Sequence, residues 1–132
     1  MFNLLDKKNS IISLIEKHHN NSIYSSKPLP KLIAVSKKQP SHKIKMALEA
    51  GQRIFGENKV QEAEERWSNH LMSYNDIELH FIGHLQTNKV KKALALFNYI
   101  HSLDRESLAV EISKHFTMSS KTKNFMIQII FV

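Results

Sequence analysis

Short apolar segments alternate with helix-like segments along most of this chain, and this alternation constrains the fold more than any other feature of the sequence. The apolar segments are predicted as strands at 32–37, 53–57, 79–83, 99–103 and 125–132. A segment with apolar residues at helical spacing follows each strand except the last. Strands that alternate with helices in this way are typical of a parallel sheet covered by helices.

The chain is expected to have two parts. Residues 1–30 form a leading helix, predicted from Phe2 to His19, and a polar linker that contains proline. Residues 31–132 contain the strand–helix units. We expect Ser41 and Asp104 to cap helices, and Asn58 with Gln61 to form a capping box at the start of another.

Two architectures fit a parallel sheet of this kind. One is a closed eight-stranded (β/α) barrel, and the other is a doubly wound open sheet. Periodicity alone does not choose between them. The fifth predicted strand is strongly hydrophobic and no helix follows it, so we expect a chain that is truncated relative to a complete fold.

Composition excludes several classes of function. The chain has no cysteine, which excludes disulfides, thiolate metal sites and cysteine nucleophiles. It has no apolar run near the roughly 20 residues of a membrane span, and its first residues do not resemble a secretory signal. The net charge of +7 raises the possibility of nucleic-acid binding, but the lysines are spread and no basic run is interleaved with aromatic residues. We therefore expect a cytoplasmic protein without a nucleic-acid or membrane partner.

Lys37 is the candidate reactive residue. It ends the first predicted strand, and alternation puts Ile33, Val35 and Lys37 on one face. In a barrel that face is the interior, and active sites gather at the carboxyl ends of the strands. An amine at such a position can attack an aldehyde. The alternative is a solvated lysine at a strand end, since Lys38 follows it.

Four blocks in order resemble the YggS-like, or PROSC-type, pyridoxal phosphate homeostasis family. They are Leu32–Lys37, Gly51–Glu62, His80–Lys89 and the weaker Ile100–Arg105. The similarity extends from about residue 31 to residue 129, which is nearly all of the chain beyond the leading helix. Several matching blocks in the same order are a more specific signal than any one block.

This resemblance implies a fold class, a cofactor and a function. The fold would be the N-terminal five-stranded part of an alanine-racemase-like (β/α)8 TIM barrel, preceded by the N-terminal helix. Lys37 would hold pyridoxal 5′-phosphate (PLP) as a Schiff base, and the protein would serve vitamin B6 homeostasis rather than act as an enzyme. PLP-dependent apoenzymes would be its protein partners. Racemase-type activity is disfavoured because the second racemase domain is absent.

The resemblance also singles out Asn58, which matches a Gly-Glu-Asn block and would contact PLP at the barrel mouth. The other interpretation of Asn58 is a helix N-cap. His80 is interpreted as a buried histidine held by a core hydrogen bond. Gln86, Asn88 and Lys89 match a turn at the rim. The histidines show no metal-binding spacing.

The sequence departs from the resembled family near its end. The family holds the cofactor phosphate with Ser-x-Gly-Met-Ser-type and Arg-x-Gly-type segments, and neither occurs here. The fifth strand in that family continues Gln-Ile/Val-Asn, whereas this chain reads Gln128-Ile129-Ile130-Phe131-Val132. We therefore expect weak PLP affinity, with a frameshift or split reading frame as the origin. The alternative function is a truncated, non-functional remnant of the family.

Overall fold

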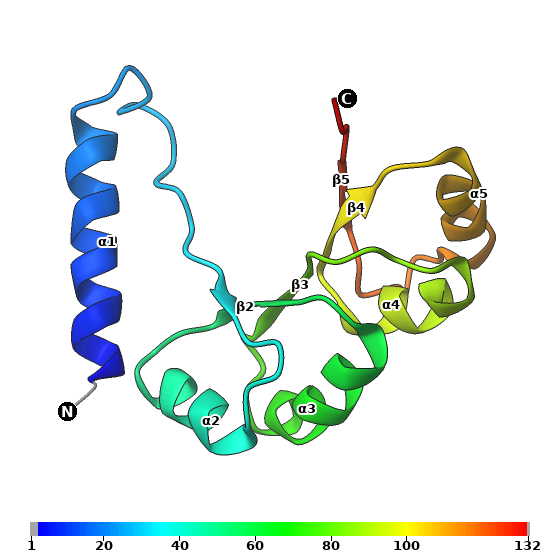
Figure 1. Cartoon of the computed structure of the whole chain (residues 1–132), viewed down its shortest axis with the longest axis horizontal. Helices are drawn as coiled ribbons and strands as arrows, with labels where there is room; N and C mark the ends of the chain where they lie inside the picture. Colours follow the sequence, from blue (N-terminus) through cyan, green and yellow to red (C-terminus); the bar gives the residue numbers. More distant parts are fainter. Residues whose placement is uncertain (1–2, 132) are drawn as a thin grey trace.

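A computed structural model describes residues 3–131 and contains one five-stranded sheet in the order β1-β2-β3-β4-β5 (Figure 1). All four strand pairs are parallel. The strands are β1 Ala34–Val35, β2 Ile54–Glu57, β3 Glu78–Phe81, β4 Tyr99–Leu103 and β5 Asn124–Ile127. The helices are α1 Leu4–Asn20, α2 Ser41–Glu49, α3 Val60–Ser73, the 3-10 turn η1 Thr87–Lys89, α4 Val90–Leu96 and α5 Glu106–His115.

The order of the strands distinguishes a barrel-like arrangement from a doubly wound sheet. A doubly wound sheet reverses its strand order near the middle. Here consecutive strands are neighbours throughout the described part, and α2 to α5 follow the same side of the sheet (Figure 1). The α/β class with parallel strands is therefore confirmed, and the doubly wound alternative is wrong.

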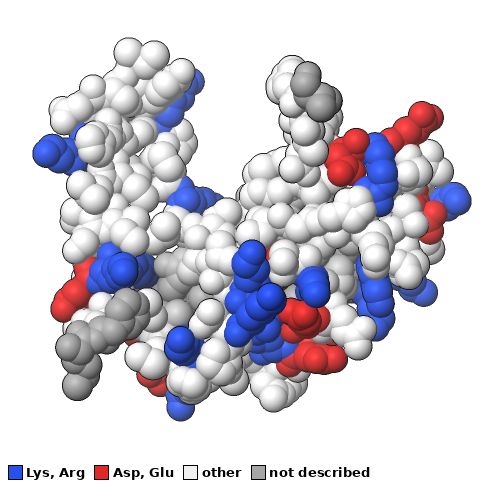
Figure 2. Space-filling model, viewed as in Figure 1, with Lys and Arg blue, Asp and Glu red and all other residues white. Residues whose placement is uncertain are grey.

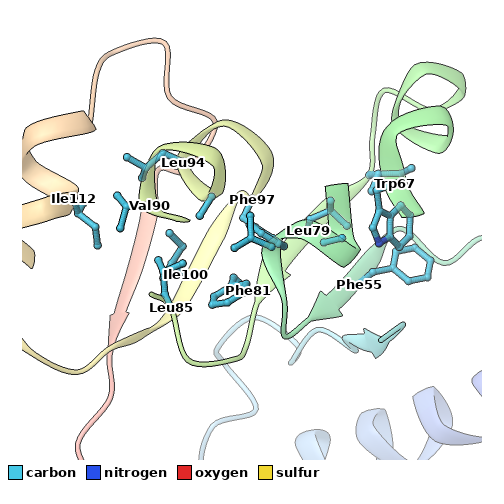
Figure 3. Packing of buried hydrophobic residues seen from close by; sticks show 14 of the residues in the cluster. Phe55, Trp67, Leu79, Phe81, Leu85, Val90, Leu94, Phe97, Ile100 and Ile112 are labelled. Carbon is cyan, nitrogen blue, oxygen red and sulfur yellow. The ribbon is translucent and has the colours of Figure 1, made fainter. Parts of the chain in front are cut away.

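Apolar side chains that point from the strands toward the helices form the core. Trp67 of α3 lies against Phe55 of β2, with ring centroids 4.6 Å apart, and both side chains are fully buried (Figure 3). Phe81 of β3 and Phe97 after α4 form a second aromatic contact at 5.1 Å. Burial of each such side chain contributes about 1.5–3 kcal/mol. These contacts hold the helices on one face of the sheet.

The opposite face of the sheet is open. In the space-filling view a hollow lies between α1 and the C-terminal segment (Figure 2). Val35 of β1 and Met126 of β5 are 51% and 43% exposed, although both are strand residues with large apolar side chains. In the same view, basic and acidic side chains are mixed over the visible face rather than collected in one basic surface.

The fifth strand is shorter than the sequence predicted. The prediction covered 125–132, but β5 ends at Ile127 and residues 128–131 lie outside any strand. Val132 lies outside the described residues. Ile127 and Ile129 are 76% and 69% exposed because no described strand or helix covers them. An exposed apolar edge of this kind favours aggregation.

The first strand is also shorter than predicted, and this moves Lys37 out of the sheet. Residues 32–37 were expected to be extended, yet β1 is only Ala34–Val35. Lys38 has a φ of 60°, which is the left-handed region, and the Gln39 amide donates to the Ser36 carbonyl at 3.1 Å. The strand therefore ends at Val35, and Lys37 lies in the tight turn from Ser36 to Gln39.

Three predicted caps are wrong. Ser41 is the first residue of α2, and its hydroxyl lies 3.1 Å from Nε2 of His70 instead of capping the helix. The capping residues of α3 and α5 are Lys59 and Arg105, with no side-chain cap bond at either. The leading helix begins at Leu4, capped by Asn3; the predicted start at Phe2 lies outside the described residues.

Among residues 3–131, no helix is long and apolar enough to cross a membrane.

Candidate functional site

Lys37 and Asn58 follow neighbouring strands at the same edge of the sheet. Val35 of β1 pairs with Gly56 of β2, and the Ser36 amide donates to the Gly56 carbonyl at 3.0 Å. Lys37 and Asn58 each stand two residues beyond that pair. The parallel register therefore brings both positions to the carboxyl ends of β1 and β2, as the sequence predicted.

Ser36 shows which side of the sheet the neighbouring positions occupy. Its side chain is buried on the helix-covered side, where the hydroxyl donates to Oε1 of Glu57 at 2.7 Å. Successive residues of an extended chain point to opposite sides. Val35, which precedes Ser36 in β1, is therefore on the open side, and Lys37 follows Ser36 in the turn that ends at Gln39.

The Lys37 amine is accessible and unpaired. Its side chain is exposed, and within residues 3–131 it forms no ion pair with a carboxylate. Asn58 is half-buried, and its side-chain amide has no hydrogen-bond partner in the same part of the chain. The N-cap interpretation of Asn58 is wrong, because α3 begins at Val60 after Lys59, and Gln61 bonds to Glu65 instead. An amine and an amide thus remain available for a ligand.

Beneath these two positions lies a buried ion pair that the sequence did not reveal. Glu57 is fully buried at the end of β2, and its carboxylate accepts hydrogen bonds from Arg66 at 2.9 Å and from Nε1 of Trp67 at 3.0 Å. The Ser36 hydroxyl donates to the same carboxylate. Glu57 therefore joins the ends of β1 and β2 to α3. No local pattern marks this pairing, since it depends on the packing of the helix on the sheet.

The loops after β3 and β4 are also joined at this edge. The Arg105 guanidinium donates to the Leu85 carbonyl at 2.6 Å and to Asp104 at 2.8 Å. The segment predicted to shape the rim forms η1, in which Asn88 is exposed and Lys89 half-buried. The structure thus places these residues in a surface turn after β3.

His80 lies on the open side of the sheet, buried among polar groups. It is 5% exposed, and its two ring nitrogens lie 2.7 Å from Glu78 and 2.7 Å from His101. The prediction of a buried histidine held by a hydrogen bond is confirmed, but the bond lies on the open side and not in the apolar core. Its partner His101 was not identified as a site residue, because the two histidines are brought together only by the register of β3 and β4.

A groove of about 460 Å³ runs along β1, but neither candidate residue lines it. Its wall includes Ser36, Ile44 and Phe55, which belong to the helix-covered side. Within the part of the chain that the structure describes, no cluster of histidine, cysteine or carboxylate side chains is arranged to hold a metal ion. The ends of β1 and β2 present a primary amine at Lys37 and an amide at Asn58. That pair fits the aldehyde end of a PLP-type cofactor.

Several curated proteins that match this sequence carry the same name. The "Pyridoxal phosphate homeostasis protein" of Buchnera aphidicola (Schizaphis graminum) is 40% identical over 99 residues, covering 75% of this chain and 43% of the relative. The protein of the same name from Helicobacter pylori is 34% identical over 128 residues, covering 96% and 57%. The chain thus spans about half the length of these curated relatives. A comparison with profiles of protein families gives no match.

Solved structures agree with the sequence matches. PipY of Synechococcus elongatus, solved with PLP bound, is 40% identical with a TM-score of 0.61. The match covers 76% of this chain and 47% of PipY. An unknown protein from Bifidobacterium adolescentis is 27% identical with a TM-score of 0.69, covering 83% and 47%. The relatives carry the name of homeostasis proteins and not of enzymes.

Proposed function

Because this chain is a homologue of the pyridoxal phosphate homeostasis proteins, we propose that it binds PLP as a Schiff base on Lys37. The observation that supports this proposal is the position of an exposed, unpaired lysine at the carboxyl end of β1, next to Asn58 at the end of β2. Active sites of parallel barrels are built at such strand ends. A homologous structure, PipY, was solved with PLP bound.

The five-stranded sheet would then correspond to part of an alanine-racemase-like (β/α)8 barrel, with its open side as the barrel interior. The consecutive strand order and the helices on one side support this proposal. Asn58 would contact the ring substituents of PLP, because its amide is free and half-buried. We place this function in the cytoplasm, with PLP-dependent apoenzymes as recipients of PLP and no reaction catalysed on a further substrate.

The alternative is a form of the family that has lost PLP binding. The observation that favours it is the exposed apolar edge at β5, where Ile127 is 76% exposed. This alternative predicts a broad thermal transition and no saturable PLP signal. The proposed function predicts a cooperative transition and a saturable signal.

Two lysine variants test the assignment. We would titrate the protein with PLP and follow Schiff-base absorbance in Lys37→Arg and in the matched control Lys38→Arg. Arginine keeps the positive charge but stays protonated, so it cannot form the bond. We expect the saturable signal to vanish in Lys37→Arg and to persist in Lys38→Arg. Equal signals in both variants would refute the assignment of Lys37.

A further inference from the structure

Three side chains on the open side of the sheet are joined by two short hydrogen bonds. Glu78 and His80 belong to β3, and His101 belongs to β4. Nε2 of His80 lies 2.7 Å from Oε1 of Glu78, and Nδ1 of His80 lies 2.7 Å from Nε2 of His101. His80, at 5% exposed, is therefore held between a carboxylate and a second imidazole.

These contacts fix the positions of the protons in the neutral form. An ionised carboxylate only accepts hydrogen bonds, so His80 carries its proton on Nε2. Nδ1 of neutral His80 is then an acceptor, and Nε2 of His101 must donate to it. Nδ1 of His101 is left with a lone pair, and no residue in 3–131 donates to it.

Uptake of one proton by this group always places a hydrogen on Nδ1 of His101. The added charge rests either on His101 itself or on His80, once the shared proton has moved across the 2.7 Å contact. In the second case the charged ring lies directly against Glu78. The Glu78 carboxylate thus stabilises the positive charge that arises when His101 accepts a proton. A catalytic base is often held in place by a third group in the same way.

The surroundings keep this group in place. The Tyr99 ring stacks on His80 with centroids 4.2 Å apart and planes 5° apart. The Lys31 ammonium lies 3.9 Å from Oε2 of Glu78. Burial and the neighbouring His80 lower the pKa of His101 below its usual value of 6.5. The accepting nitrogen is therefore free at neutral pH.

The register relates His101 to the candidate binding residues. The residues Val35, Gly56, His80 and Tyr99 form one row across the first four strands. Three residues follow members of this row by two positions: Lys37 and Asn58 lie beyond the ends of β1 and β2, and His101 lies within β4. His101 thus lies toward the same edge of the sheet as the proposed PLP lysine, with β2 and β3 between their strands.

We propose that Glu78, His80 and His101 form a proton relay that serves Schiff-base formation at Lys37, with Nδ1 of His101 as the accepting atom. This inference rests on the proposed function. The Lys37 ammonium must lose one proton before its nitrogen can bond to an aldehyde carbon. His101 takes that proton, the amine nitrogen bonds to the aldehyde carbon and then passes a second proton to the former carbonyl oxygen. His101 returns the first proton to the hydroxyl so formed, which leaves as water; C=N thus replaces C=O, and nothing is oxidised or reduced.

The first test needs no cofactor. We would record ¹⁵N spectra of histidine-labelled, ligand-free protein and assign His101 by its loss in His101→Gln. We expect the Nε2–H tautomer for both His80 and His101 at neutral pH, with both rings changing together on acidification. A His101 ring that carries its proton on Nδ1 at neutral pH would overturn the relay.

The second test measures the rate of Schiff-base formation. We compare His101→Gln with His115→Gln, a matched change at an exposed histidine of α5. In His101→Gln the introduced side-chain amide retains a donor for His80, so the fold is kept while the titrating group is lost. We expect His101→Gln to slow formation on the order of 10²-fold with the final amplitude unchanged, and His115→Gln to match the parent protein.

Identical rates and pH profiles in the parent protein and His101→Gln would overturn the relay. A parent protein that forms no Schiff base would refute the proposed function instead. The spectra of the ligand-free protein then still decide whether the relay exists, so the two failures are distinguishable.

Discussion

Gly83 lies so close to the backbone of Asn58 that a Cβ at residue 83 would stand 2.8 Å from the Asn58 Cα and closer still to its carbonyl oxygen. The obstacle is backbone, which cannot rotate aside as a side chain can. The segment after β3 is therefore seated against the turn that presents Asn58. This contact, rather than a helix cap, fixes where that turn lies.

We predict that Gly83→Ala destabilises the fold by about 1–3 kcal/mol, the usual cost of inserting an atom into a filled space. Gly56→Ala is the control, since its Cβ would meet side-chain methyl groups of Ile33 and Ile82, each at 3.1 Å, rather than backbone. Urea unfolding followed by circular dichroism measures both. A larger loss for Gly56→Ala than for Gly83→Ala would show that this backbone contact is not the tighter one.

Removing one partner of the buried Glu57–Arg66 ion pair should destabilise the fold, because the other partner then has no counter-charge. In Arg66→Met the carboxylate of Glu57 stays buried without its counter-charge, and we expect a loss of about 3–5 kcal/mol. Lys92→Met is the matched control, because Lys92 pairs with Glu64 at 3.2 Å on the exposed surface. Such exposed pairs contribute about 0–1 kcal/mol. Equal midpoints of urea unfolding for the two variants would contradict this prediction.

The lowered pKa of His101 predicts a dependence of stability on pH. Burial, and then the neighbouring His80, lower the pKa in the folded chain, so the unfolded chain binds the proton more readily. This contribution is present above the ordinary value of 6.5 and is lost as the pH falls from 6.5 through the folded pKa. Unfolding free energies of the parent protein and His101→Gln, measured from neutral to acidic pH, should therefore converge on acidification. A constant difference would refute the shift.

The phosphate group of PLP should contribute little to the affinity of this chain for PLP. These 132 residues contain no segment of the phosphate-holding types that the resemblance leads us to expect, so we expect them to attract the phosphate only through the long-range effect of the net charge of +7. We expect pyridoxal to bind less than about tenfold more weakly than PLP, a difference below about 1.4 kcal/mol. Parallel absorbance titrations measure this ratio. A ratio of several hundred would reveal a phosphate site among the residues present.

Periodicity predicted the elements better than their ends. The β4 segment, Tyr99–Leu103, has the predicted limits because alternating and buried residues fill it completely. The first strand was predicted too long, since a lysine at positive φ cannot be recognised from composition. The predicted Ser41 cap failed because a tertiary partner, His70, uses its hydroxyl from 29 residues away. The predicted caps at Asn58 and Asp104 failed because α3 and α5 begin one residue later than expected, after Lys59 and Arg105.

The candidate site residues could be predicted where the position of a single residue at the end of a strand was sufficient. Lys37 and Asn58 could be placed at neighbouring strand ends because parallel strands end at a common edge. The pairs Glu57–Arg66 and His80–His101 could not be predicted, because each depends on how two elements pack or align. Their residues carried no spacing that marks them in the sequence.

The most direct measurement of the central claim is chemical trapping. The protein is mixed with PLP, reduced with borohydride, digested and mapped by mass spectrometry. We predict one phosphopyridoxyl group per chain, on the peptide that carries Lys37. Label spread over exposed lysines such as Lys38 and Lys59, with no preference for Lys37, would contradict the claim.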